Sequence, residues 1–152
     1  MSDCKRLEGR VVVITGAAQG LGEALAKRLS DEGAKVVVAV MNFEAAQAVA
    51  ASLQDAIAVK VDVTNYDDCV AMCQAAEEKY GKIDLLVSNA AILISGAIEE
   101  LTYRQFAKVV DVNLNGYFNT CKAVVAHMRK NGKGSIVQIN SKSGKKGSAK
   151  NS

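Results

Sequence analysis

The chain alternates between short apolar runs and longer stretches in which apolar residues return every three or four positions. The run Val11–Ile14 contains only β-branched residues, which is typical of a strand buried on both faces of a parallel sheet. The spacing of Leu21, Leu25 and Leu29 is typical of an amphipathic helix. The strands predicted in this way are Val11–Ile14, Lys35–Val40, Ile57–Val61, Ile83–Val87 and Ser135–Ile139. The predicted helices run from Gly22 to about Gly33 and over 43–53, 66–80 and 103–128.

The strict alternation of strands and helices indicates repeated βαβ units. Such units have right-handed crossovers and build a parallel sheet with helices on both faces. The expected fold class is therefore α/β, with a doubly wound parallel sheet. The 152 residues fit one domain, and the sequence shows neither an internal repeat nor a linker.

Composition narrows the class of protein further. The chain is 49% hydrophobic and 23% charged, as in ordinary globular proteins. Its first ten residues are polar and lack the apolar run of a signal peptide. No apolar stretch approaches the ~18 residues of a membrane span. We therefore expect a cytoplasmic protein without a membrane partner.

Two other kinds of partner, metal ions and nucleic acids, are also disfavoured. The four cysteines form no C-x-x-C pair and His127 is the only histidine, so the ligands of a zinc site are missing. Four of the 19 basic residues lie in the last eleven positions without an acid among them. That basic tail has no aromatic residue on which bases could stack. A solvated loop or part of an anion site is expected there instead of a nucleic-acid interface.

A glycine-rich turn follows the first predicted strand. Gly16 can form the tight turn, Gly20 allows a ligand to approach the backbone, and Gly22 allows the next helix to pack close to the strand. No carboxylate lies between Thr15 and Gly22. The N-terminus of that helix is therefore suited to a phosphate or pyrophosphate group.

Polar residues also follow the other predicted strands. The strand ends are Thr15-Gly16, Val40 to Asn42, Asp62, Ser88-Asn89 and Asn140-Ser141. Each of these taken alone is ordinarily a turn or cap residue. In a parallel sheet, however, all five lie at the carboxyl ends of the strands, where ligands of this fold class bind. Their coincidence favours a binding site.

These motifs together resemble the N-terminal part of a short-chain dehydrogenase/reductase. The segment Thr15–Gly22 is similar to the T-G-x3-G-x-G signature of that family, and Ser88–Ala91 stands where the family has N-N-A-G. The resemblance implies that the cofactor is bound by Thr15, Gly16, Gln19, Gly20, Leu21, Gly22, Asp62, Val63, Asn89, Ala90 and Ala91. It further implies that Asp62-Val63 lies near the adenine. Asn113 would help to hold a proton-relay water, and Ser141 would be the catalytic serine that hydrogen-bonds the substrate oxygen.

The family resemblance implies an NAD(P)-dependent oxidoreductase that transfers hydride between the nicotinamide and a secondary alcohol or ketone. It implies a Rossmann-type sheet of order 3-2-1-4-5 in a single NAD(P)-binding domain, residues 1–152, and a homo-oligomer. The segment Ile139–Lys145 resembles the corresponding stretch of sorbitol-6-phosphate 2-dehydrogenases. Lys142 or Lys145 beside the serine could attract the phosphate of a sugar-phosphate substrate.

Three departures from the family pattern matter. Val40 stands where NAD-dependent members have an acid for the ribose, so both NAD and NADP stay open as cofactors. The absence of arginine and lysine there, together with Gln19, favours NAD. Ala91 replaces a glycine. The family's Tyr-x3-Lys pair would fall beyond Ser152.

From this last departure we expect a domain that is incomplete at its C-terminal end and inactive by itself, because a positioned proton donor contributes about 10²–10⁴-fold in rate. We also expect an exposed edge strand and poor stability in isolation. A non-catalytic dinucleotide-binding or assembly module is the alternative. A further Rossmann-like class, such as a methyltransferase or an extended-type epimerase, is disfavoured by the set Asn89, Asn113 and Ser141.

Overall fold

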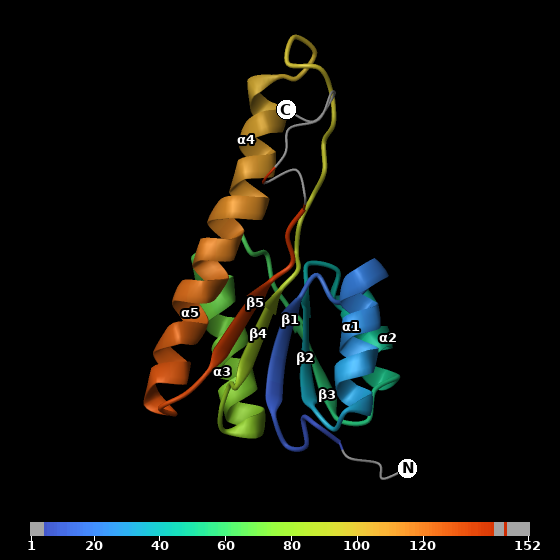
Figure 1. Ribbon diagram of the computed structural model, residues 1–152, viewed down its shortest axis with the longest axis vertical. Coiled ribbons are helices and arrows are strands. Elements are labelled where there is room, and N and C mark those ends of the chain that lie inside the picture. The colour runs from blue at the N-terminus through green and yellow to red at the C-terminus, as the bar shows by residue number, and fades with distance from the viewer. Residues whose placement is uncertain (1–4, 142–144, 146–152) are drawn as a thin grey trace.

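The computed structural model of the chain describes residues 5–141 and 145 (Figure 1). Five parallel strands form one sheet of order β3-β2-β1-β4-β5, which confirms the predicted fold class and strand order. The strands are β1 (Val11–Thr15), β2 (Lys35–Val40), β3 (Ala56–Lys60), β4 (Leu85–Ser88) and β5 (Ser135–Gln138). The helices are α1 (Gly20–Asp31), α2 (Phe43–Ala51), α3 (Tyr66–Tyr80), α4 (Tyr103–Val110) and α5 (Gly116–Lys130), with a π-helical turn η1 (Asp111–Asn115) between the last two.

The sheet separates two hydrophobic clusters. Figure 1 shows α1 and α2 on one face of the sheet and α3 and α5 on the other. Side chains alternate between the faces of a strand, so Val12 and Ile14 of β1 join the α1/α2 cluster while Val13 joins the α3/α5 cluster. All three are fully buried, and each such side chain contributes about 1.5–3 kcal/mol through burial. The central strand therefore stabilises both layers at once.

The last predicted helix, over 103–128, is present as one helical segment made of α4, the π turn η1 and α5 without a gap. The structure adds the π turn at Asp111–Asn115, which the sequence did not predict. Apolar residues recur every three or four positions along this segment. Val124 and Met128 in α5 are buried, whereas Tyr103, Phe106 and Leu114 are exposed. The reason is position: α5 packs against α3, and α4 extends past the end of the sheet (Figure 1). No α4 residue is buried among the described part of the chain.

Strand ends shift by one or two residues from the prediction, as is usual where hydrogen-bonded pairing decides the boundary. β5 lies at the edge of the sheet and all four of its residues are exposed. No helix within residues 5–141 is both long and apolar enough to cross a membrane. Over the same residues, no group of three or more His, Cys, Asp or Glu side chains is placed to hold a metal ion.

Asp84, a buried residue directly before β4, connects β1 and β5 at the amino end of the sheet. Asp84 Oδ2 accepts the Val11 N–H (2.9 Å) and lies 2.9 Å from Lys82 Nζ, and Asp84 Oδ1 accepts a hydrogen bond from Arg10 Nη1 (3.1 Å). Its backbone carbonyl accepts the Ser135 N–H (3.0 Å) at the start of β5. Burial by itself would raise the pKa of Asp84, but the hydrogen bonds from Lys82, Val11 and Arg10 outweigh it and hold that pKa below its usual value.

We predict that Asp84→Asn lowers the free energy of unfolding by roughly 1.5–3 kcal/mol at pH 7, because the variant loses charged hydrogen bonds. Since the pKa of Asp84 is depressed in the folded state, its contribution is present above the unfolded-state pKa of about 3.9 and is lost as the pH falls through the folded-state value. Urea denaturation at pH 7 and pH 3 measures both effects.

The control is Asp31→Asn, which changes an exposed carboxylate at the end of α1 and should alter stability by no more than about 0.5 kcal/mol. Equal losses in the two variants would contradict the assignment of Asp84 as the anchoring carboxylate.

Candidate functional site

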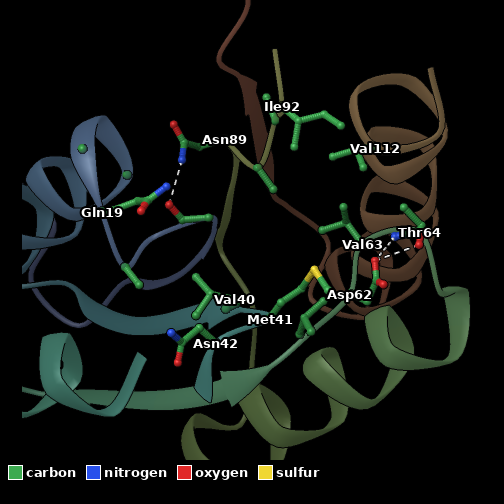
Figure 2. Close-up of a pocket in the computed structure, with 18 of the residues that line it drawn as sticks. Gln19, Val40, Met41, Asn42, Asp62, Val63, Thr64, Asn89, Ile92 and Val112 are labelled. Atoms are coloured by element: carbon green, nitrogen blue, oxygen red, sulfur yellow. Dashed lines mark hydrogen bonds between the residues drawn. The ribbon is translucent and has the colours of Figure 1, made fainter. Parts of the chain in front are cut away.

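A pocket of about 800 Å³ opens at the carboxyl ends of the strands (Figure 2). It lies over β1 and β4, where the strand order reverses, and this is the expected ligand position in an open α/β sheet. The lining comes from residues 16 and 18–22, from 39–42 and 45, from 61–64, from 89–92, and from 108, 111 and 112. Four strand ends and the α4/η1 segment thus face one cavity.

The glycine turn begins directly beside the end of β2. The Gly16 N–H donates to the Ala39 carbonyl oxygen at 2.8 Å, which extends the parallel register of Thr15 with Ala39. Helix α1 then starts at Gly20 without a side-chain cap, whereas Asn42 and Asn65 cap α2 and α3. The first N–H groups of an uncapped helix and its dipole favour an anion.

Two glycines shape the space in front of this helix. Gly20 has a φ of +54°, and a Cβ built on it would meet no atom within 4 Å. A Cβ on Gly22 would overlap the Gly16 carbonyl oxygen, so α1 packs tightly against the turn. The result is a cradle of bare backbone at the pocket, and its shape fits the close approach of a pyrophosphate.

Thr15 and Asn89 hold the β1 and β4 sides of the pocket together. The Thr15 hydroxyl accepts the N–H groups of Asn89 (3.0 Å) and Ala90 (3.1 Å). In return, Asn89 Nδ2 donates to the carbonyl oxygens of Thr15 and Gly16, both at 3.1 Å. Thr15 is buried and does not line the pocket. Its side chain therefore acts on the pocket by positioning the two turns.

The loop after β3 supplies an apolar wall with one carboxylate. Asp62 Oδ1 accepts the Thr64 N–H (2.9 Å) and the Thr64 hydroxyl (2.7 Å), so this side chain has a fixed orientation. Val63 is nearly buried, and a Cβ on Gly116 would lie 2.6 Å from its Cγ2. Asn119 Nδ2 donates to the Val63 carbonyl oxygen at 3.0 Å. An apolar surface beside a carboxylate suits an aromatic base that carries an amino group.

Asn113 joins the loop after β4 to the π turn. Its Oδ1 accepts the Ile92 N–H and its Nδ2 donates to the Ile92 carbonyl oxygen, both at 2.9 Å. Isolated π turns in a long helix frequently accompany functional sites. Asn113 itself does not line the pocket, but its neighbours Asp111 and Val112 do.

The expected site residues thus fall into two groups. Apart from Thr15, the residues with expected cofactor contacts line one pocket: Gly16, Gln19, Gly20, Leu21, Gly22, Asp62, Val63, Asn89, Ala90 and Ala91. Ser141 lies outside this lining, with its N–H donating to Asn140 Oδ1 at 2.8 Å. Lys145 is exposed, and Lys142 lies outside the described residues.

The wall formed by α4 and η1 was not foreseen from the sequence. Lys108, Asp111 and Val112 line the pocket together with Ile92. Their spacing of three and four places them on one helical face, one residue away from Asn113. That spacing was the signal available in the sequence.

Comparison with known proteins identifies the family. The sequence profile described as short chain dehydrogenase matches residues 10–152. An uncharacterised oxidoreductase of Mycobacterium bovis is 40% identical over 144 residues, which cover 93% of this chain and 58% of the relative. A galactitol 2-dehydrogenase of Agrobacterium fabrum is 40% identical over 147 residues, covering 95% of this chain and 57% of the relative.

Solved structures agree with this result. The crystal structure of a 3-ketoacyl-(acyl-carrier-protein) reductase from Brucella melitensis, complexed with NADH, superposes with a TM-score of 0.91 at 33% identity. The match covers 95% of this chain and 62% of the reductase. The chain therefore spans less than two thirds of the length of each of these three proteins. On its fold and the match over residues 10–152, the chain belongs to the short-chain dehydrogenase family.

Proposed function

We propose that this chain is the dinucleotide-binding part of an NAD(P)-dependent oxidoreductase that acts on a secondary alcohol or ketone. The observation that carries the proposal is the open glycine cradle at Gly20, which faces the same pocket as the apolar wall at Val63. Pyrophosphate and adenine require those two surfaces side by side. The NADH complex of the Brucella reductase, a protein of the same fold, supports this reading.

The chain's own residues would divide the binding as follows. Backbone N–H groups at the start of α1 would bind the pyrophosphate, and Asp62 with Val63 would hold the adenine. Asn89 to Ala91 would border the centre of the pocket, where the Ala91 methyl replaces the hydrogen of the family's glycine. The bound dinucleotide would supply or accept the hydride.

Two residues would take part in substrate binding and proton transfer. We propose that Ser141 hydrogen-bonds the substrate oxygen, as the family resemblance implies. Asn113 would keep the π turn and the β4 loop in register, because its amide oxygen and its amide nitrogen both bond the Ile92 backbone. It would also help to hold the relay water. Dinucleotide binding tests the proposal directly, because the pocket that carries it is built from described residues.

For the substrate we propose a polyol or a sugar phosphate. The similarity of Ile139–Lys145 to sorbitol-6-phosphate 2-dehydrogenases and the galactitol 2-dehydrogenase among the relatives support this class. Lys142 and Lys145 would then attract the phosphate.

An assembly module or a homo-oligomer is the second candidate. Apolar side chains are exposed along α4, η1 and α5, at Tyr103 (85%), Phe106, Leu114 and Phe118, and contiguous exposed apolar surface commonly marks an interface. We expect sedimentation velocity to show species larger than a monomer as the concentration rises. A monomer at every concentration would count against this candidate and leave the dinucleotide proposal unaffected.

We predict that Gly20→Ala weakens NADH binding at least about tenfold, because the new methyl group would occupy the open cradle. The matched control is Gly81→Ala. Gly81 ends α3 with a φ of +77° and also faces open space, but it does not line the pocket. In both variants an alanine takes a left-handed conformation, at a similar cost of about 1–2 kcal/mol.

Fluorescence titration of NADH with the 152-residue chain and both variants checks the prediction. Thermal denaturation shows whether the two variants lose similar stability. Equal affinities in the two variants would contradict the placement of the pyrophosphate, and no binding to the unaltered chain would overturn the proposed function.

We also predict that Asn113→Ala lowers the free energy of unfolding by about 1–3 kcal/mol, because two backbone groups of Ile92 lose their partners. The Ile92 amide should exchange its hydrogen faster. The control is Asn115→Ala in the same turn. The exposed Asn115 side chain donates a hydrogen bond of 3.1 Å to Asp111 Oδ1 within the same helix. Urea denaturation and hydrogen exchange measure both effects. Unchanged exchange at Ile92 in Asn113→Ala would contradict the positioning assignment.

A further inference from the structure

The loop between β3 and α3 is held from outside the pocket by one side of α5. Gly116, Asn119 and Lys122 follow one another at intervals of three along that helix, and residues three apart are neighbours on a helix surface. A Cβ on Gly116 would lie 2.6 Å from Val63 Cγ2, and Lys122 Nζ lies 4.5 Å from the centre of the Tyr66 ring. Asn119, between them, hydrogen-bonds the backbone of the loop.

Asn119 restrains one peptide group of this loop. Its Nδ2 donates to the Val63 carbonyl oxygen at 3.0 Å and to the Thr64 carbonyl oxygen at 3.3 Å, which matches the two N–H donors of an amide. Cys69 Sγ also donates to the Val63 oxygen, at 3.7 Å, but a thiol is a weak donor. Asn119 is therefore the main restraint on the direction of the Val63 carbonyl.

The same peptide group orients the carboxylate of Asp62. A peptide bond is planar and trans, so the Val63 C=O and the Thr64 N–H point in opposite directions and turn together. The Thr64 N–H donates to Asp62 Oδ1 at 2.9 Å and the Thr64 hydroxyl donates to the same oxygen at 2.7 Å (Figure 2). Asn119 thus holds one end of the peptide and Asp62 the other. A rotation of this peptide would break both contacts.

The other carboxylate oxygen of Asp62 is available to a ligand. Asp62 lines the pocket, whereas Asn119 does not. Within residues 5–141 the hydrogen bonds of the Asp62 side chain all end on Oδ1, so Oδ2 can accept an N–H of a ligand amino group. The Asp62 backbone N–H is held separately, by Asp68 Oδ2 at 3.0 Å. What depends on Asn119 is therefore the direction of the carboxylate.

We propose that Asn119 is a positioning residue for recognition of the adenine amino group. By holding the Val63–Thr64 peptide, it keeps Asp62 Oδ2 turned toward the 6-amino group of the base without touching the ligand itself. The inference rests on the proposed function, since it takes the pocket to be the dinucleotide site with its adenine beside Asp62. The side of α5 that packs on the loop thereby contributes to the choice of base.

The test compares NADH with reduced nicotinamide hypoxanthine dinucleotide. Hypoxanthine carries a carbonyl oxygen at position 6, where adenine carries the amino group, so the Asp62 carboxylate would accept a bond from the one and repel the other. Both dinucleotides fluoresce through the reduced nicotinamide, and titration with the 152-residue chain gives two dissociation constants. Their ratio isolates the base, because a general loss of stability would weaken both affinities together.

Four variants are compared with the unaltered chain. Asn119→Ala removes the amide, and Asn119→Asp has the same size but presents carboxylate oxygens to the two carbonyl groups. Lys122→Ala is the matched control, because it removes a contact between the same side of α5 and Tyr66, which does not line the pocket. Asp62→Ala removes the carboxylate itself and is also combined with Asn119→Ala. Thermal denaturation confirms that each variant is folded.

We expect the unaltered chain and Lys122→Ala to prefer NADH by at least about tenfold. Asn119→Ala and Asn119→Asp should reduce that preference to less than about threefold. Asp62→Ala should do the same, and the addition of Asn119→Ala to it should change the ratio no further, because the amide acts through the carboxylate.

An undiminished preference in folded Asn119→Ala overturns the inference. So does the lack of a preference in the unaltered chain, because Asp62 would then not face the amino group. If the Asn119 variants do not fold, nuclear magnetic resonance of the unaltered chain decides. The Asn119 side-chain amide protons should exchange slowly with solvent and should shift more on binding NADH than on binding the hypoxanthine dinucleotide. Rapid exchange or equal shifts would overturn the inference.

Failure to bind either dinucleotide would overturn the proposed function, and the inference with it. This outcome is distinguishable from the others, because no ratio of affinities can then be measured.

Discussion

The pocket depends on the reciprocal hydrogen bonds between Thr15 and Asn89. In a sheet of order β3-β2-β1-β4-β5 the crossovers after β1 and β4 leave in opposite directions, so the two turns diverge and leave a space between them. The Thr15 hydroxyl and the Asn89 amide tie those turns together with four bonds of 3.0–3.1 Å. Because Thr15 is buried, these bonds are protected from competition with water. They fix the β1 and β4 walls of the pocket relative to each other.

The two ends of the sheet use polar groups in different ways. At the amino end, the Asp84 carboxylate is satisfied by Val11, Arg10 and Lys82. At the carboxyl end, α1 begins without a side-chain cap. The backbone groups there are the ones that a ligand can use. The polar groups that stabilise the sheet therefore lie at the amino ends of its strands, and the backbone groups open to a ligand lie at the carboxyl ends. Such a separation lets one fold accept different ligands.

The strands, the helices and the glycine turn could be predicted from the sequence, because each depends on residues that are neighbours in the chain. The β-branched run at Val11–Ile14 and the glycines after it belong to consecutive residues, so their pattern alone indicated the strand, the turn and the start of α1. The π-helical turn at Asp111–Asn115 could not be predicted. An uninterrupted apolar stripe indicates one helix, whereas the π turn accompanies the bonds between Asn113 and Ile92, which are distant in the sequence. The wall at Lys108 and Val112 was not predicted either, because it depends on where α4 and η1 lie beyond the strand ends.

Gly116 shows how a residue outside the pocket supports one of its walls. Its bare Cα lets the first turn of α5 rest on Val63, more than fifty positions earlier in the chain. A Cβ there would lie 2.6 Å from Val63 Cγ2, so any larger residue would force α5 and the β3 loop apart. Because Val63 lines the pocket and Gly116 does not, substitutions far from the cavity can still displace its wall.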